Sequence, residues 1–164
     1  MVIWIIGKSG AGKTFLADKL YRKLKKDVKK IKWIDGDRFR KKYSKDLGYT
    51  KIDRKKNSLR IQHHCRDIEK KGYLVICSIL SIFRDHQKKN RKLFNKYFQV
   101  FIRVDNTRVI KRNKKKIYSK KYNVVGQDIK FTTPYKSHII IKNNFDYKFS
   151  KNVGKIAKRL YEFI

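Results

Sequence analysis

The stretch Val2-Ile3-Trp4-Ile5-Ile6, followed by Gly7-Lys8-Ser9-Gly10-Ala11-Gly12-Lys13-Thr14, decides the fold. Its second part has the spacing G-x-x-x-x-G-K-[ST], in which glycines let successive backbone N–H groups turn toward one anion. The apolar residues before it predict a buried strand, and the residues after it predict a helix whose positive dipole end points at the same anion. A chance match is the alternative reading, and the strand before and helix after reduce it. The stretch therefore predicts a phosphate-binding loop.

This loop predicts ATP and Mg²⁺ as the bound species. Lys13 is expected to reach the β- and γ-phosphates of ATP, and the Thr14 hydroxyl to ligate Mg²⁺. The loop pattern does not separate a kinase from a GTPase or a motor ATPase. The chain is short for a motor and carries no Asn-Lys-x-Asp guanine signal, so we expect a small kinase. The expected ATP-binding residues in the loop are Gly7, Ser9, Gly10, Ala11, Gly12, Lys13 and Thr14.

Composition predicts one cytoplasmic domain spanning residues 1–164. With 40% hydrophobic and 13% aromatic residues, a chain of this length can bury a core. It has no apolar run long enough to cross a bilayer and no signal-peptide pattern, so we expect no membrane partner. Cys65 and Cys77 have no ligand-like spacing and indicate a reducing compartment.

The charge is unusual, with 46 Lys and Arg against 13 Asp and Glu, a formal +33. Such a field attracts polyanions, so nucleic acid is a candidate partner. The basic residues are spread along the whole chain, however, and form no helix-turn-helix, zinc-finger or RNA-binding signature. We therefore expect no specific nucleic-acid partner, and only non-specific adhesion at low salt. A basic P-loop ATPase or kinase acting on nucleic acid stays open as the alternative function.

Strand-like and helix-like segments alternate along the chain. Short apolar runs rich in β-branched or aromatic residues predict strands at Val2–Ile6, Ile31–Ile34, Tyr73–Ile79, Phe98–Val104 and His138–Ile141. Helical patterns follow at Lys13 to about Lys26, Arg54 to about Lys71, Arg84 to about Phe94, Thr107 to about Arg112 and about Phe149 to Phe163. This alternation predicts an α/β fold, a mainly parallel sheet with helices on both faces.

Asp35-Gly36-Asp37 follows the second predicted strand, at the edge of the sheet where ligands bind. One carboxylate can hold Mg²⁺-bound water while the other orients or deprotonates an attacking hydroxyl. An ordinary Asp-Gly turn is the alternative reading. Arg40 would fall on the same side of a helix that starts at Asp37.

From this point the chain resembles the adenylylsulfate (APS) kinases. The segments that carry the resemblance are Asp35-Gly36-Asp37-Arg38-Phe39-Arg40, Lys45-Asp46-Leu47-Gly48-Tyr49, Asp53-Arg54-Lys55-Lys56-Asn57 with Arg60-Ile61, and Leu80-Ser81-Ile82-Phe83-Arg84. It continues through Val100-Phe101-Ile102, Arg112, Asn123-Val124-Val125-Gly126 and Pro134. The resemblance spans residues 2 to about 141 almost without gaps, and its motifs are specific in combination.

The resemblance implies a P-loop kinase fold with a short basic lid at about residues 113–125, a homodimer, and transfer of the ATP γ-phosphate to a ribose 3′-hydroxyl. It implies Asp37, Lys13 and Asp35 as catalytic residues, with Thr14 and Asp35 at the metal. Arg112 would lie along the base of ATP. The implied residues around the small-molecule nucleotide acceptor are Arg40, Tyr49, Arg54, Asn57, Leu80, Ser81, Ile82, Phe83, Lys120 and Val124. Lys120 reads equally well as a solvated loop residue.

Three departures from the family pattern fall around the acceptor. Tyr49 replaces Phe, Ile82 replaces Pro, and Val124-Val125 replaces Phe-Thr, which removes the second aromatic ring that sandwiches the adenine of APS. Loss of one stacking partner costs about 1–3 kcal/mol. Two acceptors therefore stay open: APS, in sulfate assimilation, and cytidine diphosphoramidate, which other members of the family phosphorylate in capsular polysaccharide modification.

Overall fold

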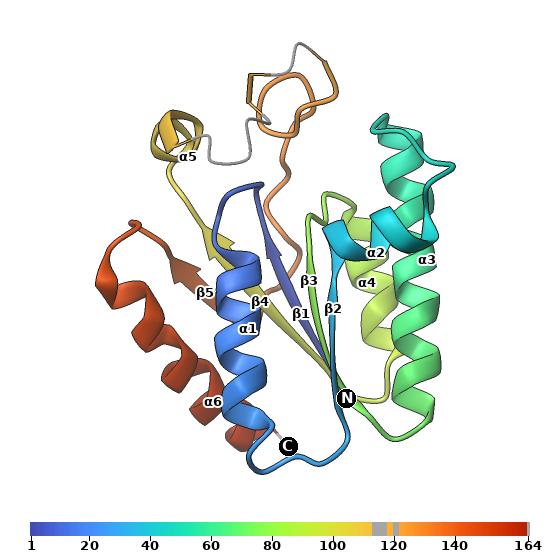
Figure 1. Ribbon diagram of the computed structural model, residues 1–164, viewed down its shortest axis with the longest axis vertical. Helices are drawn as coiled ribbons and strands as arrows, with labels where there is room; N and C mark the ends of the chain where they lie inside the picture. The colour runs from blue at the N-terminus through green and yellow to red at the C-terminus, as the bar shows by residue number, and fades with distance from the viewer. Residues whose placement is uncertain (113–117, 120–121, 164) are drawn as a thin grey trace.

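A computed structural model of the chain describes residues 1–112, 118–119 and 122–163. Its centre is a five-stranded parallel sheet with strand order β2-β3-β1-β4-β5 (Figure 1). The strands are β1 (Val2–Gly7), β2 (Ile31–Asp35), β3 (Leu74–Ile79), β4 (Tyr97–Arg103) and β5 (Ile139–Lys142). All five predicted strands are present, with small shifts at their ends.

Helices cover both faces of this sheet, as the alternating pattern predicts. They are α1 (Lys13–Leu24), α2 (Gly36–Tyr43), α3 (Lys51–Lys70), α4 (Arg84–Leu93), α5 (Asn106–Arg112) and α6 (Asn152–Phe163), with a short 3₁₀ helix η1 (Tyr147–Lys151) before α6. In Figure 1, α1 and α6 cover one face, and α3 and α4 cover the other. The α/β prediction is confirmed.

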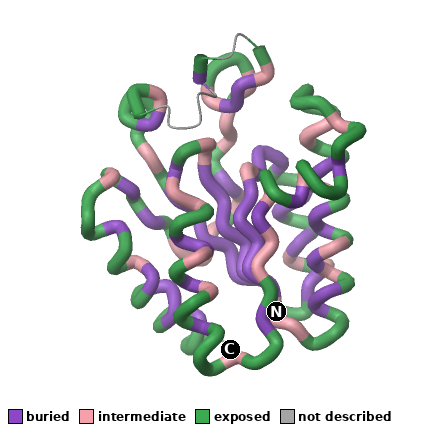
Figure 2. Tube along the Cα trace, in the orientation of Figure 1, coloured by how far each residue is buried: buried purple, intermediate pink, exposed green. Residues whose placement is uncertain are grey.

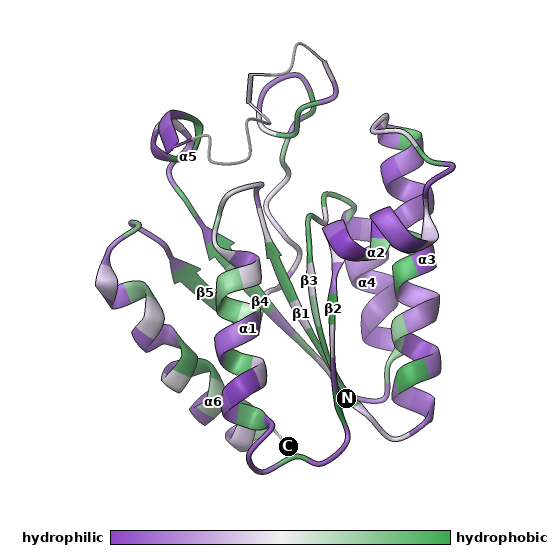
Figure 3. Cartoon of the chain, viewed as in Figure 1, coloured by the Kyte–Doolittle hydropathy of each residue, from purple (hydrophilic) through white to green (hydrophobic). Residues whose placement is uncertain are grey.

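Alternating residues of β1 belong to two layers of the core. The central strands are coloured mostly as buried in Figure 2 and largely as hydrophobic in Figure 3. Ile3 and Ile5 face the layer shared with α1 and α6, while Trp4 and Ile6 face the layer shared with α3. Both faces of the central strand are therefore apolar, as expected for a parallel sheet covered on both sides. Cys65 and Cys77 are free and buried in the second layer.

Capping residues set two helix starts near the ligand-binding edge. Thr50 accepts a hydrogen bond from the Asp53 N–H at 3.2 Å, so α3 begins at Lys51, one turn earlier than the apolar pattern suggested. The Asp35 carboxylate accepts from the N–H groups of Asp37 and Arg38 and begins α2. These caps fix the backbone on which Asp37 and Arg54 stand.

The predicted lid at about 113–125 falls partly outside the described residues, and Lys120 lies outside them. Within the described part, Tyr118 is buried, and its hydroxyl donates to the Ser9 carbonyl at 2.9 Å. Tyr118, in the segment predicted as a lid, therefore contacts the phosphate-binding loop directly. Across the described residues, none of the helices combines the length and apolar character needed to cross a membrane.

Candidate active site

The phosphate-binding loop runs from the end of β1 to the start of α1. Gly10 and Gly12 have φ angles of 77° and 94°, in the left-handed region that favours glycine. A Cβ at Gly12 would also lie 2.9 Å from Asn143 Nδ2 and from the Phe149 ring. Lys13 Nζ donates to the Lys8 carbonyl at 2.8 Å, which holds the ammonium group inside the loop. The loop therefore has the backbone shape that its glycine spacing predicts.

Thr14 and Asp35 meet beside this loop. The Thr14 hydroxyl donates to Asp35 Oδ2 at 2.9 Å, and Ser78 Oγ donates to the same oxygen at 3.0 Å. Hydroxyl and carboxylate oxygens are the hard donors that Mg²⁺ prefers, and Mg²⁺ usually takes its other ligands from water and nucleotide phosphates. The two residues therefore fit a Mg²⁺ site shared with ATP. Among the described residues, no cluster of three His, Cys, Asp or Glu side chains forms a metal site built from protein alone.

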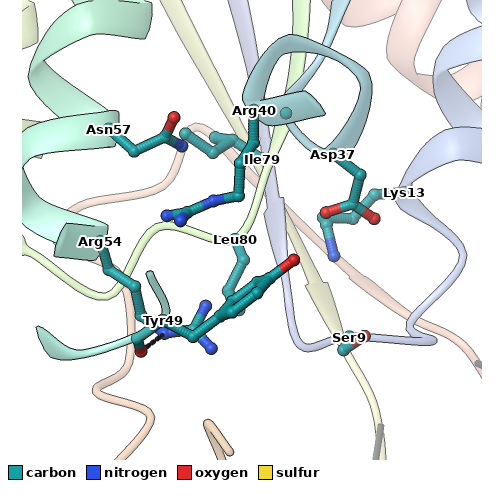
Figure 4. Close-up of a pocket in the computed structure, with 10 residues that line it drawn as sticks. Ser9, Lys13, Asp37, Arg40, Tyr49, Arg54, Asn57, Ile79 and Leu80 are labelled. Carbon is teal, nitrogen blue, oxygen red and sulfur yellow. Dashed lines mark hydrogen bonds between the residues drawn. The ribbon is translucent and has the colours of Figure 1, made fainter. Parts of the chain in front are cut away.

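A pocket opens between the loop, α2 and α3 (Figure 4). It is lined by Ser9, Lys13, Gly36, Asp37, Arg40, Tyr49, Arg54, Asn57, Ile79 and Leu80. Eight of these residues are among those predicted for catalysis, ATP or the acceptor. The structure thus brings Asp37 and Lys13 to the same pocket as Arg40 and Arg54, the two arginines predicted to bind the acceptor.

Two guanidinium groups lie close to the Tyr49 ring in this pocket. The guanidinium carbons of Arg40 and Arg54 lie 4.9 and 5.4 Å from the centre of its ring. Arg54 also donates from Nε to the Tyr49 carbonyl at 2.9 Å and from a terminal nitrogen to the Asn123 carbonyl at 2.8 Å. Burial, and then the nearby charge of Arg40, lowers the pKa of Arg54 from its usual value. Two cations held this close favour an anionic ligand.

Four predicted acceptor residues lie outside this pocket. Ser81 is buried, 3.4 Å from Gln87 Nε2, and Ile82 and Phe83 pack with Val125 in a small apolar cluster. Val124 is 3% exposed and packs against Val109 and Tyr118. Ile82 and Phe83 line a separate groove, and the contact of all four side chains with an acceptor stays a prediction.

A second cavity lies on the other side of the phosphate-binding loop, where the sequence predicts the base of ATP. It is lined by Gly10, Gly12, Phe15, Arg112, Asn143, Phe145, Asp146, Tyr147, Phe149 and Ser150. The Arg112 guanidinium carbon lies 4.4 Å from the centre of the Phe145 ring. The buried Asn143 donates from Nδ2 to the Ala11 carbonyl at 3.0 Å, and its Oδ1 accepts from the Phe145 N–H at 2.7 Å.

Sequence reasoning missed Asn143, Phe145 and Tyr118 as parts of this site. For Asn143 a signal was present, because polar residues that directly follow a buried parallel strand lie at the ligand-binding edge. Phe145 follows two residues later, with a left-handed φ of 64°. Nothing in the local sequence around Tyr118 indicates that its hydroxyl reaches the loop 109 residues earlier.

The two cavities meet at the Gly-rich loop, and this arrangement suits phosphoryl transfer. Backbone N–H groups and Lys13 can hold a polyphosphate chain, with the Arg112 cavity on one side for a base. The pocket of Asp37, Arg40 and Arg54 on the other side can hold an anionic second substrate, with a carboxylate available to accept a proton. An ATPase without an acceptor would not need this second, arginine-lined pocket.

Comparison with known proteins agrees with this geometry. Residues 1–142 match the family described as adenylylsulphate kinase. The cytidine diphosphoramidate kinase of Campylobacter jejuni subsp. jejuni serotype O:2 is 31% identical over 167 residues, covering 97% of this chain and 95% of that protein. A probable adenylyl-sulfate kinase of Archaeoglobus fulgidus is 31% identical over 145 residues, covering 85% of this chain and 94% of the relative.

The fold agrees as well. The structure of the Mycobacterium tuberculosis APS kinase CysC in complex with AMPPNP and APS superposes with a TM-score of 0.87 at 24% identity, covering 98% of this chain and 96% of that one. An identity of 24% supports the fold alone. The family assignment rests instead on the match over residues 1–142, which is most of the chain. The chain belongs to the adenylylsulphate kinase family, phosphotransferases with a hydroxyl acceptor.

Proposed function

We propose that this protein transfers the γ-phosphate of ATP to the ribose 3′-hydroxyl of a 5′-substituted nucleotide, and that this acceptor is cytidine diphosphoramidate. The observation that supports this most directly is the pocket in which Asp37 and Lys13 lie with Arg40, Tyr49 and Arg54. It offers a proton acceptor, an ammonium group for the transferring phosphoryl group, two cations for the acceptor's 5′-phosphates and one aromatic ring for its base.

Each side chain has a distinct part in the proposed reaction. The backbone N–H groups of the loop and Lys13 bind the ATP phosphates and offset the charge that develops on them. Asp37 orients the 3′-hydroxyl and accepts its proton. Thr14 and Asp35 hold Mg²⁺, which when bound neutralises phosphate charge. Tyr118, by its bond to Ser9, closes the loop side of the site and limits access of water.

The single aromatic ring supports the pyrimidine acceptor. Tyr49 lines the pocket, whereas Val124, at the position of the family's second stacking ring, is buried against Val109 and Tyr118. Among the described residues that line the pocket, Tyr49 is the one aromatic. A small base loses less binding free energy than a purine when only one ring is available for stacking. APS remains the second candidate, because the family match and the Archaeoglobus relative both carry that name.

The test is Mg²⁺-ATP consumption with cytidine diphosphoramidate and with APS in parallel, at moderate salt. We expect turnover with the cytidine compound and at least tenfold lower kcat/KM with APS, from the missing stacking ring. Efficient turnover with APS alone would assign the protein to sulfate activation and would mean that Val124 does not determine the choice of acceptor. ATP turnover stimulated only by nucleic acid would refute both acceptors.

The homodimer is a further part of the proposal, by likeness to the family. Light scattering at several salt concentrations tests it, because the net charge of +33 opposes association most strongly at low salt. A mass of one chain at moderate salt, with kinase activity intact, would contradict it.

A further inference from the structure

Four cationic side chains converge on Tyr135, on the α4 side of the sheet and outside both cavities of the kinase site. The charged groups of Arg84, Lys88, Arg91 and Lys136 lie 5.7, 5.1, 5.7 and 5.7 Å from the centre of its ring. No other aromatic ring in the described part of the chain has more than two such contacts. A lysine-rich surface alone would spread its cations more evenly over the exposed rings.

These charges are uncompensated. All four charges surround one ring, so any two of them are at most about 11 Å apart. This separation is close to the screening length of about 8 Å at physiological salt, so salt screens their mutual repulsion only in part. None of the four forms an ion pair with a carboxylate within the described residues. The Nε of Arg91 is buried without a hydrogen-bond partner there. A multivalent anion that binds to this cluster would therefore reduce the repulsion among its charges.

Buried polar groups hold this cluster in place. The Tyr135 N–H donates to Gln87 Oε1 at 2.6 Å, and the Tyr135 carbonyl accepts from Gln99 Nε2 at 2.9 Å. Both glutamines are fully buried. Arg91 donates to the carbonyls of Tyr135 and Lys136, and Lys136 has a φ of 40°, a conformation that costs energy for a residue with a side chain. The fold thus fixes the backbone of Tyr135 and Lys136 and the guanidinium of Arg91.

Arg84 connects the Tyr135 cluster to a second group of cations. Arg84 also lines an open groove beside α3, where Lys51, Lys55 and Lys130 stand over an apolar floor that includes Phe83. Asp85 lies in the same groove and pairs with Lys55 at 3.3 Å. Cations outnumber carboxylates in this groove by four to two, because Asp128 lines it as well as Asp85. Cations spread over the cluster and the groove, beside the half-buried ring of Tyr135, suit a single strand of nucleic acid, whose phosphates contact the cations while one base stacks on the ring. A compact anion would not use both groups of cations, and a second copy of the chain would be repelled by them.

We propose that the surface formed by Tyr135, Arg84, Lys88, Arg91 and Lys136 binds single-stranded nucleic acid without sequence preference, with one base stacked on Tyr135. The flexible stems of Lys88 and Lys136 let their ammonium groups move from the ring to the phosphates when a base arrives. This proposal does not rest on the identity of the kinase acceptor, because none of these side chains lines the catalytic pocket or the cavity near Arg112.

The test separates this surface from the general charge of the protein. A labelled 12-nucleotide oligo-U is titrated by fluorescence anisotropy at several salt concentrations, with the loop occupied by a non-hydrolysable ATP analogue. The double variant Lys88→Gln/Lys136→Gln is compared with Lys155→Gln/Lys158→Gln, which removes the same charge from exposed positions on α6, across the sheet. We expect the salt slope to fall by about 1.4 in the first pair, at about 0.7 per phosphate contact, and by much less in the second.

A second comparison tests stacking without any change of charge. Tyr135→Leu is expected to weaken binding roughly tenfold or more, while Tyr161→Leu, at an exposed tyrosine of α6, leaves it unchanged. Equal effects within both comparisons would mean adhesion by net charge and overturn the proposal. A lysine effect without a Tyr135 effect would mean a surface for phosphates alone and overturn the single-strand assignment. Unchanged kinase turnover in every variant confirms that each is folded.

Discussion

Replacing Arg54 with lysine is expected to loosen the turn at residues 122–129 even when no substrate is bound. Arg54 is the bridge between the Tyr49 carbonyl, beside α3, and the Asn123 carbonyl, in that turn. A lysine keeps the charge but has a single nitrogen, so it can reach one of the two carbonyls and not both. The link between the Tyr49 carbonyl and the turn is then lost.

The size of the effect follows from the contacts. A hydrogen bond from a charged donor contributes about 1.5–3 kcal/mol, and Arg54 loses one of its two. Because Arg54 is only half-buried, water screens part of this, and we take the lower end, about 1.5 kcal/mol. That free energy corresponds to roughly a tenfold larger population of the detached turn.

Hydrogen exchange followed by mass spectrometry measures this directly in the free enzyme. Peptides covering 122–129 are expected to exchange roughly tenfold faster in Arg54→Lys than in the parent protein. Arg60→Lys is the matched control on the same helix, because Arg60 contacts Asp46 and the Tyr43 carbonyl and not the turn. Equal exchange in the parent protein and Arg54→Lys would refute the bridge, whatever happens to catalysis.

Three further predictions concern catalysis, the loop and pH. Asp37→Asn is expected to lower kcat by about 10²–10⁴-fold with little change in KM for ATP, and steady-state kinetics showing full turnover would remove Asp37 from its role as proton acceptor. Gly12→Ala places a methyl group against Asn143 at a residue with a left-handed backbone. It should abolish ATP binding measured by calorimetry and lower the free energy of unfolding by about 1–2 kcal/mol or more, and tight ATP binding would contradict this. Burial lowers the pKa of His86, and burial together with the nearby Arg91 lowers the pKa of His138. Both histidines therefore stabilise the fold above their unfolded pKa of about 6.5, and this contribution is lost as the pH falls through their lowered folded pKa values. Tm should therefore be lower at pH 5 than at pH 7.5, His86→Gln should shrink the difference, and a Tm independent of pH in this range would count against it.

Local patterns were sufficient to predict the scaffold. The apolar runs located all five strands, and the Gly-x-x-x-x-Gly-Lys-Thr spacing predicted the loop that the φ angles of Gly10 and Gly12 now explain. The family resemblance also grouped Arg54 and Asn57 in one predicted site, and both residues, three apart on α3, line the same pocket. These features are local, because each depends on residues close together in the chain.

The parts that sequence missed depend on long-range register. Asn143 reaches the Ala11 carbonyl, 132 residues earlier, because the pairing of β5 with β4 brings the end of β5 to the loop. The motif around Ile82 and Phe83 gave the order of its residues but not the direction of the backbone, which places both side chains in an apolar cluster with Val125 and outside the pocket. The start of α3 was misjudged because a cap at Thr50 outweighs the apolar period.

The order of strands in the sheet has a consequence for synthesis. β1 is the middle strand and all six of its residues are buried, yet it pairs with β3 and β4, which follow it by about 70 and 95 residues. At roughly 5–20 residues per second, this apolar segment waits on the order of 4–20 s on the ribosome before both neighbours exist. During that time it is a natural target for chaperones, and slowed translation of residues 30–100 should increase aggregation of the nascent chain more than slowed translation after residue 105.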